Sequence, residues 1–520
     1  MGVGGAASSA ALRAVAWVTA GWVGLRALAA GAWVQHPHAL EWQEAAMFEH
    51  AARASAGLPI YGPPSVEFTA FPYPPLFHWL GGLLVQASPT ADGAAWAVDG
   101  AAAGLPALRW VSAAATVAVL ACLVLAGRRR WGLAAGLLSA GAFVAADGWT
   151  GSWCLLARVD ALFLALTAAS ILVGTSRPAL GDGPRAGSAA AGALAGALGA
   201  LAVLAKQVAL GPLVALVVGL LLRPTSRPAG VAAGAVGGVA LAVAFALLHR
   251  ATDGWFEFHV VSVLAGSPWY APAAAGFPVE VLLAWAPLVV VAALATRAPR
   301  SARALHPAET LALSSLVAIA WVGRAHEGGY DNTLLPAALA LAWCTGPLLA
   351  RLDGRSPAWS AALGALLLGW LTVTAPPASV PLEPAGPGPG AEALAARVRA
   401  VEGAVWQPHG AVDPRVPGGV HAMAVVDLLK SREEAAAAKL QADLEAALAE
   451  RRFGAIVLGV ELSDWASLEA LTRNYRVVDR LDGRLGGRLE GQLDGQPEGG
   501  AALLPATGAP IGPRLWLEPR

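Results

Sequence analysis

The sequence predicts an α-helical, polytopic membrane protein that ends in a small α/β domain outside the bilayer. Three observations lead to this prediction. Hydrophobic residues make up 56% of the 520 positions and charged residues only 13%, whereas a soluble protein has roughly 25% charged residues. Apolar runs of about 20 residues, long enough to cross a bilayer, recur from Leu12 to Ala375. Beyond residue 375 the charged side chains return, and no apolar run is long enough to span.

Eleven apolar segments in residues 1–375 have the composition of membrane spans. The first is predicted to be a retained helix and not a signal peptide, because Arg26 interrupts its apolar run and no clean small-residue cleavage site follows. The predicted spans are residues 12–34, 106–127, 131–148, 160–175, 188–205, 207–222, 229–248, 278–296, 308–323, 332–350 and 356–375.

The arginines orient these predicted spans. They cluster in alternate loops, as at residues 128–130, 223–227 and 351–355, and cytoplasmic loops of membrane proteins carry an excess of Arg and Lys. This alternation requires that Pro74–Ala87, which is short for a span, lie at the outer surface as an interfacial or re-entrant helix. The N-terminus is then cytoplasmic, and residues 35–105 form one large outer loop.

Residues 376–390 are rich in Pro and Gly and are predicted to link the membrane domain to an extracytoplasmic domain, residues 391–520. In that domain Ser431–Arg451 has a helical pattern, and Phe453–Gly459 is typical of a buried strand, which together indicate an α/β fold. Its role could be acceptor binding, cover for the site, or structure alone. Residues 481–500 repeat near-tetrapeptides and are predicted to be a low-complexity flexible loop.

Acidic residues concentrate in the predicted outer loop, where Glu41, Glu44, Glu49 and Glu67 follow the first span. Acids at a membrane face are costly to bury without compensation, so such a group indicates a function. A carboxylate here could act as general base toward an acceptor hydroxyl. Glu41 and Glu44 share the first turn and one face of the next helix if that helix starts near Glu41. The alternative is that both acids only complement the helix dipole.

Cations that could bind a phosphate are predicted at the same outer face. Lys206, followed by Gln207, is the only lysine before residue 430, and it lies at a turn between two apolar runs. Arg158 and Asp160 open the fourth predicted span. Arg and Lys neutralise a leaving phosphate, and Asp160 would orient Arg158 or bind a metal. The simpler alternatives are a solvated lysine at a helix end and a structural Arg158–Asp160 ion pair.

Two further segments could contact a substrate. Tyr73-Pro-Pro-Leu76 sets the entry to the interfacial helix, since proline suits a first helical turn, and Tyr73 could also touch substrate. Arg324 and His326 lead into a polar, Gly-containing loop that ends at Asn332. His326 is there either a loop cap or a substrate contact.

Several other kinds of partner and site find no support. The formal net charge of zero argues against a nucleic-acid partner. Cys122, Cys154 and Cys344 have no metal or redox spacing and are predicted to be packing residues. No Gly-rich nucleotide loop, zinc spacing or Ser-His-Asp order stands out in the sequence.

Short motifs occur in a definite order along the membrane domain. An acidic outer loop is followed by Gly57-x-Pro-x-Tyr61, Tyr73-Pro-Pro-Leu76, the Arg-x-Asp helix start at Arg158, the Lys206-Gln207 turn and Asn332-x-Leu-Leu-Pro336. This order resembles that of bacterial GT-C superfamily membrane glycosyltransferases, especially those similar to the dolichyl-phosphate-mannose-protein mannosyltransferases and the lipopolysaccharide-core transferases. The resemblance covers most of residues 12–375.

The resemblance implies an inverting sugar transfer from a polyprenyl-phosphate donor to a glycan, lipid or protein acceptor, at the outer face of the bacterial cytoplasmic membrane. An acid of the first outer loop is the base in that family, so Glu41 and Glu44 are the candidates, with Glu44 narrowly preferred. Some superfamily members use a divalent metal and others do not, so the metal question stays open. The candidate substrate-binding residues are Tyr73, Arg158, Asp160, Lys206, Gln207, Arg324 and His326, with Arg158 and Lys206 on the donor phosphate.

A lipid or polysaccharide transporter or flippase is the main alternative from another functional class. Such proteins often contain internal repeats and polar residues near the membrane midplane. The sequence has no evident repeat, and its polar residues cluster at the predicted outer face. Both observations favour the glycosyltransferase.

Overall fold

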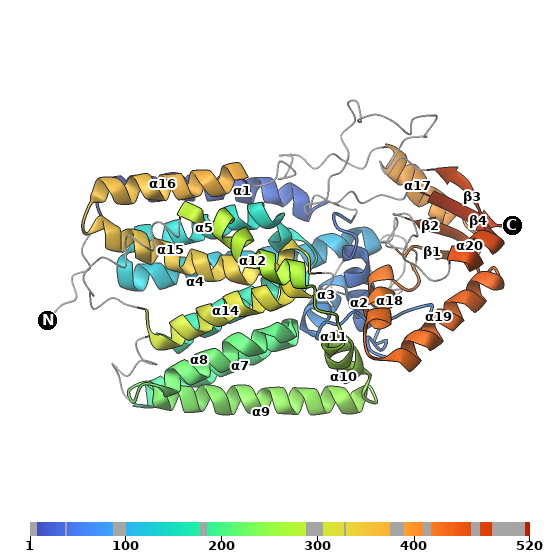
Figure 1. Ribbon diagram of the computed structural model, residues 1–520, viewed down its shortest axis with the longest axis horizontal. Coiled ribbons are helices and arrows are strands. Elements are labelled where there is room, and N and C mark those ends of the chain that lie inside the picture. Colours follow the sequence, from blue (N-terminus) through green and yellow to red (C-terminus); the bar gives the residue numbers. More distant parts are fainter. Residues whose placement is uncertain are drawn as a thin grey trace.

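A computed structural model describes residues 8–36, 39–86, 100–176, 185–287, 305–326, 329–374, 389–408, 416, 418–458, 468–480 and 515–520. A long helical body makes up most of the molecule, and a smaller α/β unit lies at one end of it (Figure 1). The N-terminus and the C-terminus lie at opposite ends of the long axis. The polytopic helical fold with a small C-terminal sheet is thus confirmed.

Each of the eleven predicted spans overlaps a helix of the body. Eight helical segments of the described chain are long and apolar enough to cross a membrane, whereas α6, α8 and α12 are shorter apolar helices. Part of the predicted span 278–296 lies outside the described residues. The helices are α1 (Ala10–Val34), α4 (Gly100–Trp131), α5 (Leu133–Thr150), α6 (Val159–Gly174), α7 (Arg185–Ala205), α8 (Leu210–Leu221), α9 (Arg227–Ala251), α12 (Ala271–Ala284), α14 (Pro307–Ala325), α15 (Leu335–Asp353) and α16 (Pro357–Thr374).

Small residues let α7 and α9 pack backbone to backbone. Gly192 and Gly196 are one helical turn apart on α7, and they face Ala229 and Ala233 of α9. A Cβ atom at Gly196 would overlap the carbonyl oxygen of Ala233. Such a pattern of small residues at a four-residue spacing is typical of helix pairs in membranes, where close packing is a main source of association.

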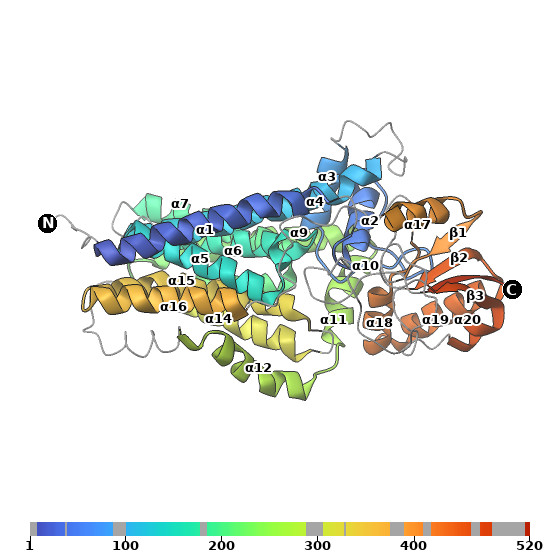
Figure 2. The ribbon, with the colours of Figure 1, turned by 90° about the horizontal axis from the view of Figure 1, so that it is seen from above.

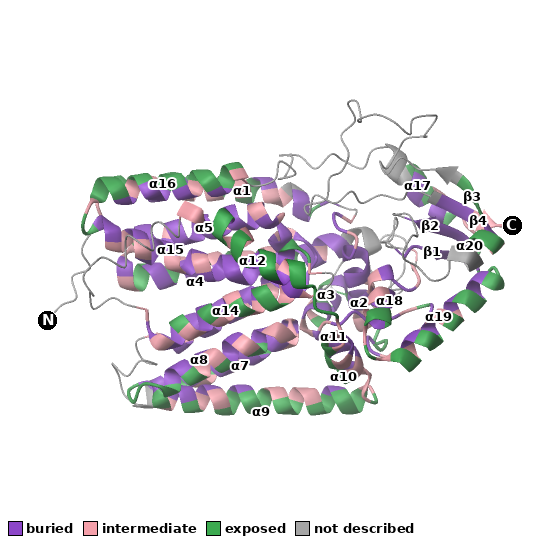
Figure 3. Ribbon diagram, in the orientation of Figure 1, coloured by how far each residue is buried: buried purple, intermediate pink, exposed green. Residues whose placement is uncertain are grey.

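The peripheral helices carry many exposed residues, as Figure 3 shows for α9 and α16, and many of these residues are apolar. In the most apolar stretch of each helix, only 11% of the residues of α9 and 28% of those of α16 are buried inside the protein, and for α1 the share is 17%. A surface of this kind suits contact with lipid chains. Its exposed residues include Trp17, Leu25 and Leu28 of α1, Val231, Val239 and Leu247 of α9, and Trp359, Leu366 and Val373 of α16.

Arginine-bearing helix ends gather at the end of the body that lies away from the α/β unit (Figures 1 and 2). Arg130, at the end of α4, forms an ion pair with Glu309 at the start of α14, and it donates to the carbonyl oxygen of Thr175 after α6 at 3.1 Å. Arg129 donates to the carbonyl oxygen of Leu172. The three helix ends therefore lie together, in agreement with the alternation of the arginine loops.

The segment between α1 and α4 lies between the helical body and the α/β unit. It carries α2 (Glu44–Ser55) and α3 (Leu76–Gln86). The α3 helix has 11 residues, which is too short to cross a bilayer. Other short elements at this end are η1 (Trp153–Leu155), η3 (Gln207–Ala209), α10 (Trp255–Glu257), η4 (Phe258–Ser262), α11 (Val263–Ala265) and η5 (Asp331–Leu334).

The C-terminal unit has a four-stranded sheet of order β1-β2-β4-β3. Strand β1 is parallel to β2, and β4 is antiparallel to both β2 and β3. Most of the predicted linker 376–390 and the whole low-complexity segment 481–500 lie outside the described residues. The elements are α17 (Pro389–Arg399), β1 (Ala404–Trp406), α18 (Ala422–Lys430), α19 (Glu434–Ala449), β2 (Phe453–Leu458), α20 (Leu468–Asn474), β3 (Tyr475–Arg480) and β4 (Leu515–Pro519).

Candidate active site

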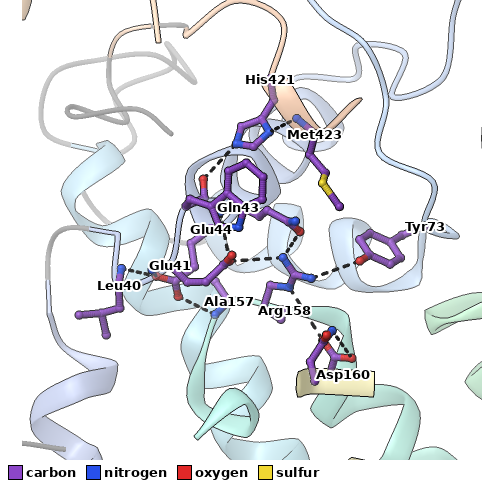
Figure 4. Close-up of polar contacts among 12 residues, drawn as sticks. Leu40, Glu41, Gln43, Glu44, Tyr73, Ala157, Arg158, Asp160, His421 and Met423 are labelled. Atoms are coloured by element: carbon purple, nitrogen blue, oxygen red, sulfur yellow. Dashed lines mark hydrogen bonds and ion pairs between the residues drawn. The ribbon is translucent and has the colours of Figure 1, made fainter. Parts of the chain in front are cut away.

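Most of the predicted site residues meet where the first outer loop lies against the start of α6 (Figure 4). Glu41 and Glu44 come from the segment around the start of α2, and Tyr73 comes from the segment before α3. Arg158 is the residue before α6, and Asp160 lies in its first turn. These side chains approach one another although 117 positions separate Arg158 from Glu41 and 85 separate it from Tyr73.

Glu44 is a fully buried carboxylate with several hydrogen-bond donors. It accepts from Arg109 Nε at 2.8 Å and Nη2 at 2.6 Å, and from the backbone N–H groups of Leu40 at 2.5 Å and Ala157 at 2.7 Å. Burial alone would raise the pKa of Glu44, but the charge of Arg109 and these hydrogen bonds outweigh it and lower the pKa. Glu44 is therefore ionised in the folded protein at neutral pH.

The α2 helix begins at Glu44, so Glu41 precedes it and does not share its first turn. The physical reason is the Glu44 side chain, which also accepts from the backbone N–H of Glu41 at 3.2 Å. A carboxylate that reaches back to the N–H groups before a helix fixes the helix start. The conditional expectation that both acids occupy one helical turn is thus wrong.

Glu41 is equally buried but has fewer partners. Its Oε2 atom accepts from the backbone N–H of Gln43 at 3.1 Å and from Arg158 Nη1 at 3.3 Å. Its Oε1 atom has no hydrogen-bond partner among the described residues. Burial raises the pKa of Glu41 to about 7, although the charge of Arg158 opposes this rise. A carboxylate with a free oxygen and such a pKa can exchange a proton near neutral pH.

Arg158 lies at the centre of the site. Besides its contact with Glu41, its guanidinium donates to the side-chain oxygen of Gln43 and to the Tyr73 hydroxyl at 3.2 Å. Its Nε atom lies 3.8 Å from Asp160 Oδ2 and has no hydrogen-bond partner in the described part of the chain. The guanidinium is also 5.5 Å from the centre of the Trp153 ring. Arg158 thus keeps one N–H group available.

Lys206 joins this site through Asp160. Its Nζ atom donates to Asp160 Oδ1 at 2.6 Å, and Asn332 Nδ2 lies 3.3 Å from both carboxylate oxygens. Lys206 Nζ is also 5.9 Å from the centre of the Tyr73 ring, and the guanidinium carbon of Arg158 is 5.8 Å from the same ring centre. Two cations therefore flank one aromatic ring, and Asp160 fixes the distance between them.

Gln207, Arg324 and His326 have other surroundings. Gln207 Nε2 donates to the carbonyl oxygens of Pro72 at 2.7 Å and Val260 at 3.2 Å, and so it anchors the segment that carries Tyr73. Arg324 binds both carboxylate oxygens of Glu280, at 3.3 and 3.2 Å. His326 Nδ1 lies 3.2 Å from the carbonyl oxygen of Ser267. Arg324 and His326 thus contact α12 and the segment before it, and none of these hydrogen bonds involves Glu41 or Arg158.

Sequence reasoning missed several residues of the site, of which Arg109 is the most important. It is fully buried and binds Glu44 from α4. A charged residue inside the predicted span 106–127 was a detectable signal, because such a residue needs a partner. Gln43 lies between the two candidate acids and Asn332 begins the last motif, but nothing in the sequence links them to Arg158 or Asp160. For His421, in the C-terminal unit, no sequence motif indicates a contact with the outer loop.

A cavity of about 220 Å³ lies next to this site, between α1, α4, α5 and η1. Its lining is mostly apolar and includes Val34, Leu120 and Phe143, with Arg26 and Asp147 as charged members. The η1 turn separates it from Arg158. Among the described residues no group of three or more His, Cys, Asp or Glu side chains is arranged to hold a metal ion.

Comparison with known proteins identifies the fold. No family model and no curated protein matches the sequence. Among solved structures, ArnT from Cupriavidus metallidurans in the apo state has a TM-score of 0.55 and 15% identity, over 89% of this chain and 97% of that one. The Archaeoglobus fulgidus oligosaccharyltransferase, in complex with Zn and sulfate, has a TM-score of 0.51 and 12% identity, over 83% of this chain and 67% of that one.

The chain therefore has the fold of polytopic membrane glycosyltransferases. Within that class, ArnT and the oligosaccharyltransferase are both of the GT-C type, and the GT-C fold expected from the motif order is confirmed. ArnT has also been crystallised bound to undecaprenyl phosphate, and that structure aligns with a TM-score of 0.47 and 18% identity, over 87% of this chain and 85% of that one.

Proposed function

We propose that this chain transfers a sugar from a polyprenyl-phosphate donor to an acceptor hydroxyl, with inversion at the anomeric carbon, at the outer face of a bacterial cytoplasmic membrane. The observation that carries the proposal is the pair formed by Glu41 and Arg158. A buried carboxylate with a pKa of about 7 and an unpartnered oxygen lies 3.3 Å from a guanidinium that has an unpartnered N–H group. This pair combines a base with an anion-binding group in one site.

Glu41 is the proposed general base, in preference to Glu44. The acceptor hydroxyl transfers its proton to Glu41 Oε1, and its oxygen attacks the anomeric carbon of the donor sugar. The bond from that carbon to the phosphate oxygen breaks, and polyprenyl phosphate leaves. A single displacement inverts the anomeric configuration. The leaving phosphate gains one negative charge while Glu41 loses one, so the total charge of the site does not change.

Arg158 and Lys206 are the proposed ligands of the donor phosphate. Both are largely buried cations, and charge-assisted hydrogen bonds in a water-poor site are strong. Asp160 binds both and sets their spacing. The Tyr73 hydroxyl, 3.2 Å from Arg158, would hold the guanidinium in place before the donor arrives. These contacts stabilise charge where it increases during the reaction.

The isoprenoid chain of the donor requires an apolar surface beside the phosphate. The cavity between α1, α4 and α5 supplies one on the far side of the η1 turn from Arg158. ArnT, whose fold this chain shares, has been crystallised with undecaprenyl phosphate, which supports a lipid-linked donor of that class. The acceptor class, whether glycan, lipid or protein, is left open by this proposal.

The direct test uses the purified protein in lipid nanodiscs with a panel of polyprenyl-phosphate sugars. We expect one donor to release polyprenyl phosphate, with the sugar recovered on an acceptor in the opposite anomeric configuration. Retention of configuration would contradict the single displacement. Movement of intact sugar lipid between the leaflets of proteoliposomes, without release of polyprenyl phosphate from any donor, would contradict the enzyme assignment and favour a flippase.

A further inference from the structure

One residue of the C-terminal unit reaches into the loop that carries Glu41. His421 precedes α18, and its Nδ1 atom accepts the backbone N–H of Met423 at 3.1 Å, so it caps that helix. On its other side, His421 Nε2 lies 3.1 Å from the carbonyl oxygen of Trp42. Figure 4 shows the ring between the two segments. Trp42 is the direct neighbour of Glu41 in the chain.

The two contacts determine the tautomer of His421. Because Nδ1 accepts a hydrogen bond, the proton of the neutral ring is on Nε2, which then donates to the Trp42 carbonyl oxygen. The ring is buried, with 6% of its surface exposed. It also packs against the Trp42 ring at 5.2 Å between centroids and against Phe71 at 5.1 Å. One side chain therefore holds both the backbone and the side chain of Trp42.

Two further contacts hold the same face of the C-terminal unit against the outer loop. The backbone N–H of Val420, next to His421, donates to the carbonyl oxygen of Val66 at 2.8 Å. Arg452 forms an ion pair with Glu67, one residue further on. Val66 itself belongs to the hydrophobic core of the C-terminal unit. The outer loop and the C-terminal unit thus form one packed body, in which His421 contacts the residue next to Glu41.

We infer that His421 is a positioning residue that holds the Glu41 segment in its reactive place, so that the C-terminal unit is a structural part of the active site. This inference rests on the proposed role of Glu41. In the same segment the carboxylates of Glu41 and Glu44 bind the N–H groups of Leu40, Glu41 and Gln43, and the carbonyl oxygens of Glu41 and Gln43 accept from the N–H groups of Glu44 and Met47. Without His421 the Trp42 carbonyl oxygen loses its hydrogen bond to the C-terminal unit, and small displacements of a catalytic group are costly to rate.

The test is His421→Asn in the full-length protein. Asn is a good N-cap residue, so α18 keeps its cap, but its side chain is shorter than that of His and does not bridge to the Trp42 carbonyl oxygen. We expect kcat to fall by about 10- to 100-fold, with little change in KM for the donor. Amide hydrogen exchange of residues 39–43 should rise, while exchange of α19 stays as in the wild type.

The matched control is His306→Asn. His306 caps α14 through the same kind of contact, from its Nδ1 atom to the backbone N–H of Ala308 at 3.1 Å, at the opposite end of the helical body. This variant should retain kcat and the exchange of residues 39–43. It shows whether replacement of a capping histidine by Asn is harmful in itself.

Four outcomes would overturn the inference. A fall in kcat without faster exchange of residues 39–43 would mean that His421 does not act through the loop. Faster exchange with unchanged kcat would mean that His421 holds the loop but that catalysis does not depend on this contact. A wild-type protein that transfers no sugar would end both the proposed function and this inference, whereas an active wild type with an unaffected His421→Asn variant would end the inference alone.

Discussion

At the scale of single residues, two glutamates three positions apart have opposite environments. Glu44 has the charge of Arg109 beside it and a lowered pKa, whereas Glu41 keeps a free oxygen and a pKa of about 7. The sequence could not separate them, because the partners of Glu44 lie 65 and 113 positions away, at Arg109 and Ala157. Local spacing predicts that the acids are close together, but only the tertiary contacts assign their charges.

Glu44→Gln should impair folding before it impairs chemistry. Gln keeps the shape of the side chain but leaves Arg109 as a buried cation without its carboxylate. Breaking a buried ion pair on one side costs on the order of 3–5 kcal/mol. We expect a lower Tm and a lower yield of folded protein in detergent. A variant with wild-type Tm would show that the Glu44–Arg109 pair is not a structural element.

The pH dependence of kcat/KM should follow Glu41. A general base acts only without its proton, so kcat/KM should be low at pH 5.5, increase through a midpoint near 7 and level off above it. The profile should be measured with the donor at a concentration far below KM, so that it reports the free enzyme. A rate that is independent of pH between 6 and 8 would contradict this assignment.

At the scale of helices and strands, local composition was sufficient for most of the fold. Each predicted span needed only an apolar run, and the short α3 helix agrees with the prediction, made from the arginine alternation, that this segment does not cross. Local composition does not predict which helices pack together, because the contact of α7 with α9 depends on which small residues face each other. The start of α2 was also missed, because the Glu44 side chain sets it through hydrogen bonds to the preceding backbone.

Gly196→Val should separate α7 from α9. A side chain at this position would overlap the Ala233 carbonyl oxygen, and overpacking of this kind costs about 1–3 kcal/mol. The control is Gly238→Val in α9, because a Cβ atom there has no neighbour within 4 Å. Thermal unfolding in detergent should show a lower Tm for the first variant only. Equal values of Tm for both variants would mean that the glycine contact does not hold the pair together.

At the scale of the whole molecule, the two units meet at the site. The outer loop and α6 supply the charged groups, while the C-terminal unit holds the loop through His421 and Val420. The end of α4, the start of α9 and the end of α15, which carry Arg130, Arg227 and Arg351, lie at the other end of the body (Figure 1). The positive-inside rule predicts that this end is cytoplasmic, and on that basis we propose that the candidate site and the C-terminal unit lie outside the cytoplasm.

Labelling with a membrane-impermeant thiol reagent tests this orientation in intact cells. A cysteine in place of the exposed Glu445 of α19 should react without permeabilisation, and one in place of the exposed Arg223, between α8 and α9, should react only after it. Background should be small, since Cys122 and Cys154 are buried. The reverse pattern would place the site on the cytoplasmic side.

The central claim is that Glu41 is the base, and its environment gives that claim a second readout. The folded-state pKa of about 7 lies above the ordinary 4.5. Between these pH values Glu41 is protonated in the folded protein and ionised in the unfolded chain. The free energy of unfolding therefore falls as pH rises, and the whole destabilisation from the buried charge of Glu41 is present above pH 7. Removing the charge at position 41 should therefore stabilise the protein at alkaline pH, in contrast to the effect at Glu44.

The most direct test compares Glu41→Gln with the wild type at pH 8.5, by sugar transfer and thermal unfolding of the same purified samples. The account predicts that transfer falls by about 10²- to 10⁴-fold while Tm equals or exceeds that of the wild type. A folded Glu41→Gln variant that transfers sugar at a rate within a few-fold of the wild type would contradict it.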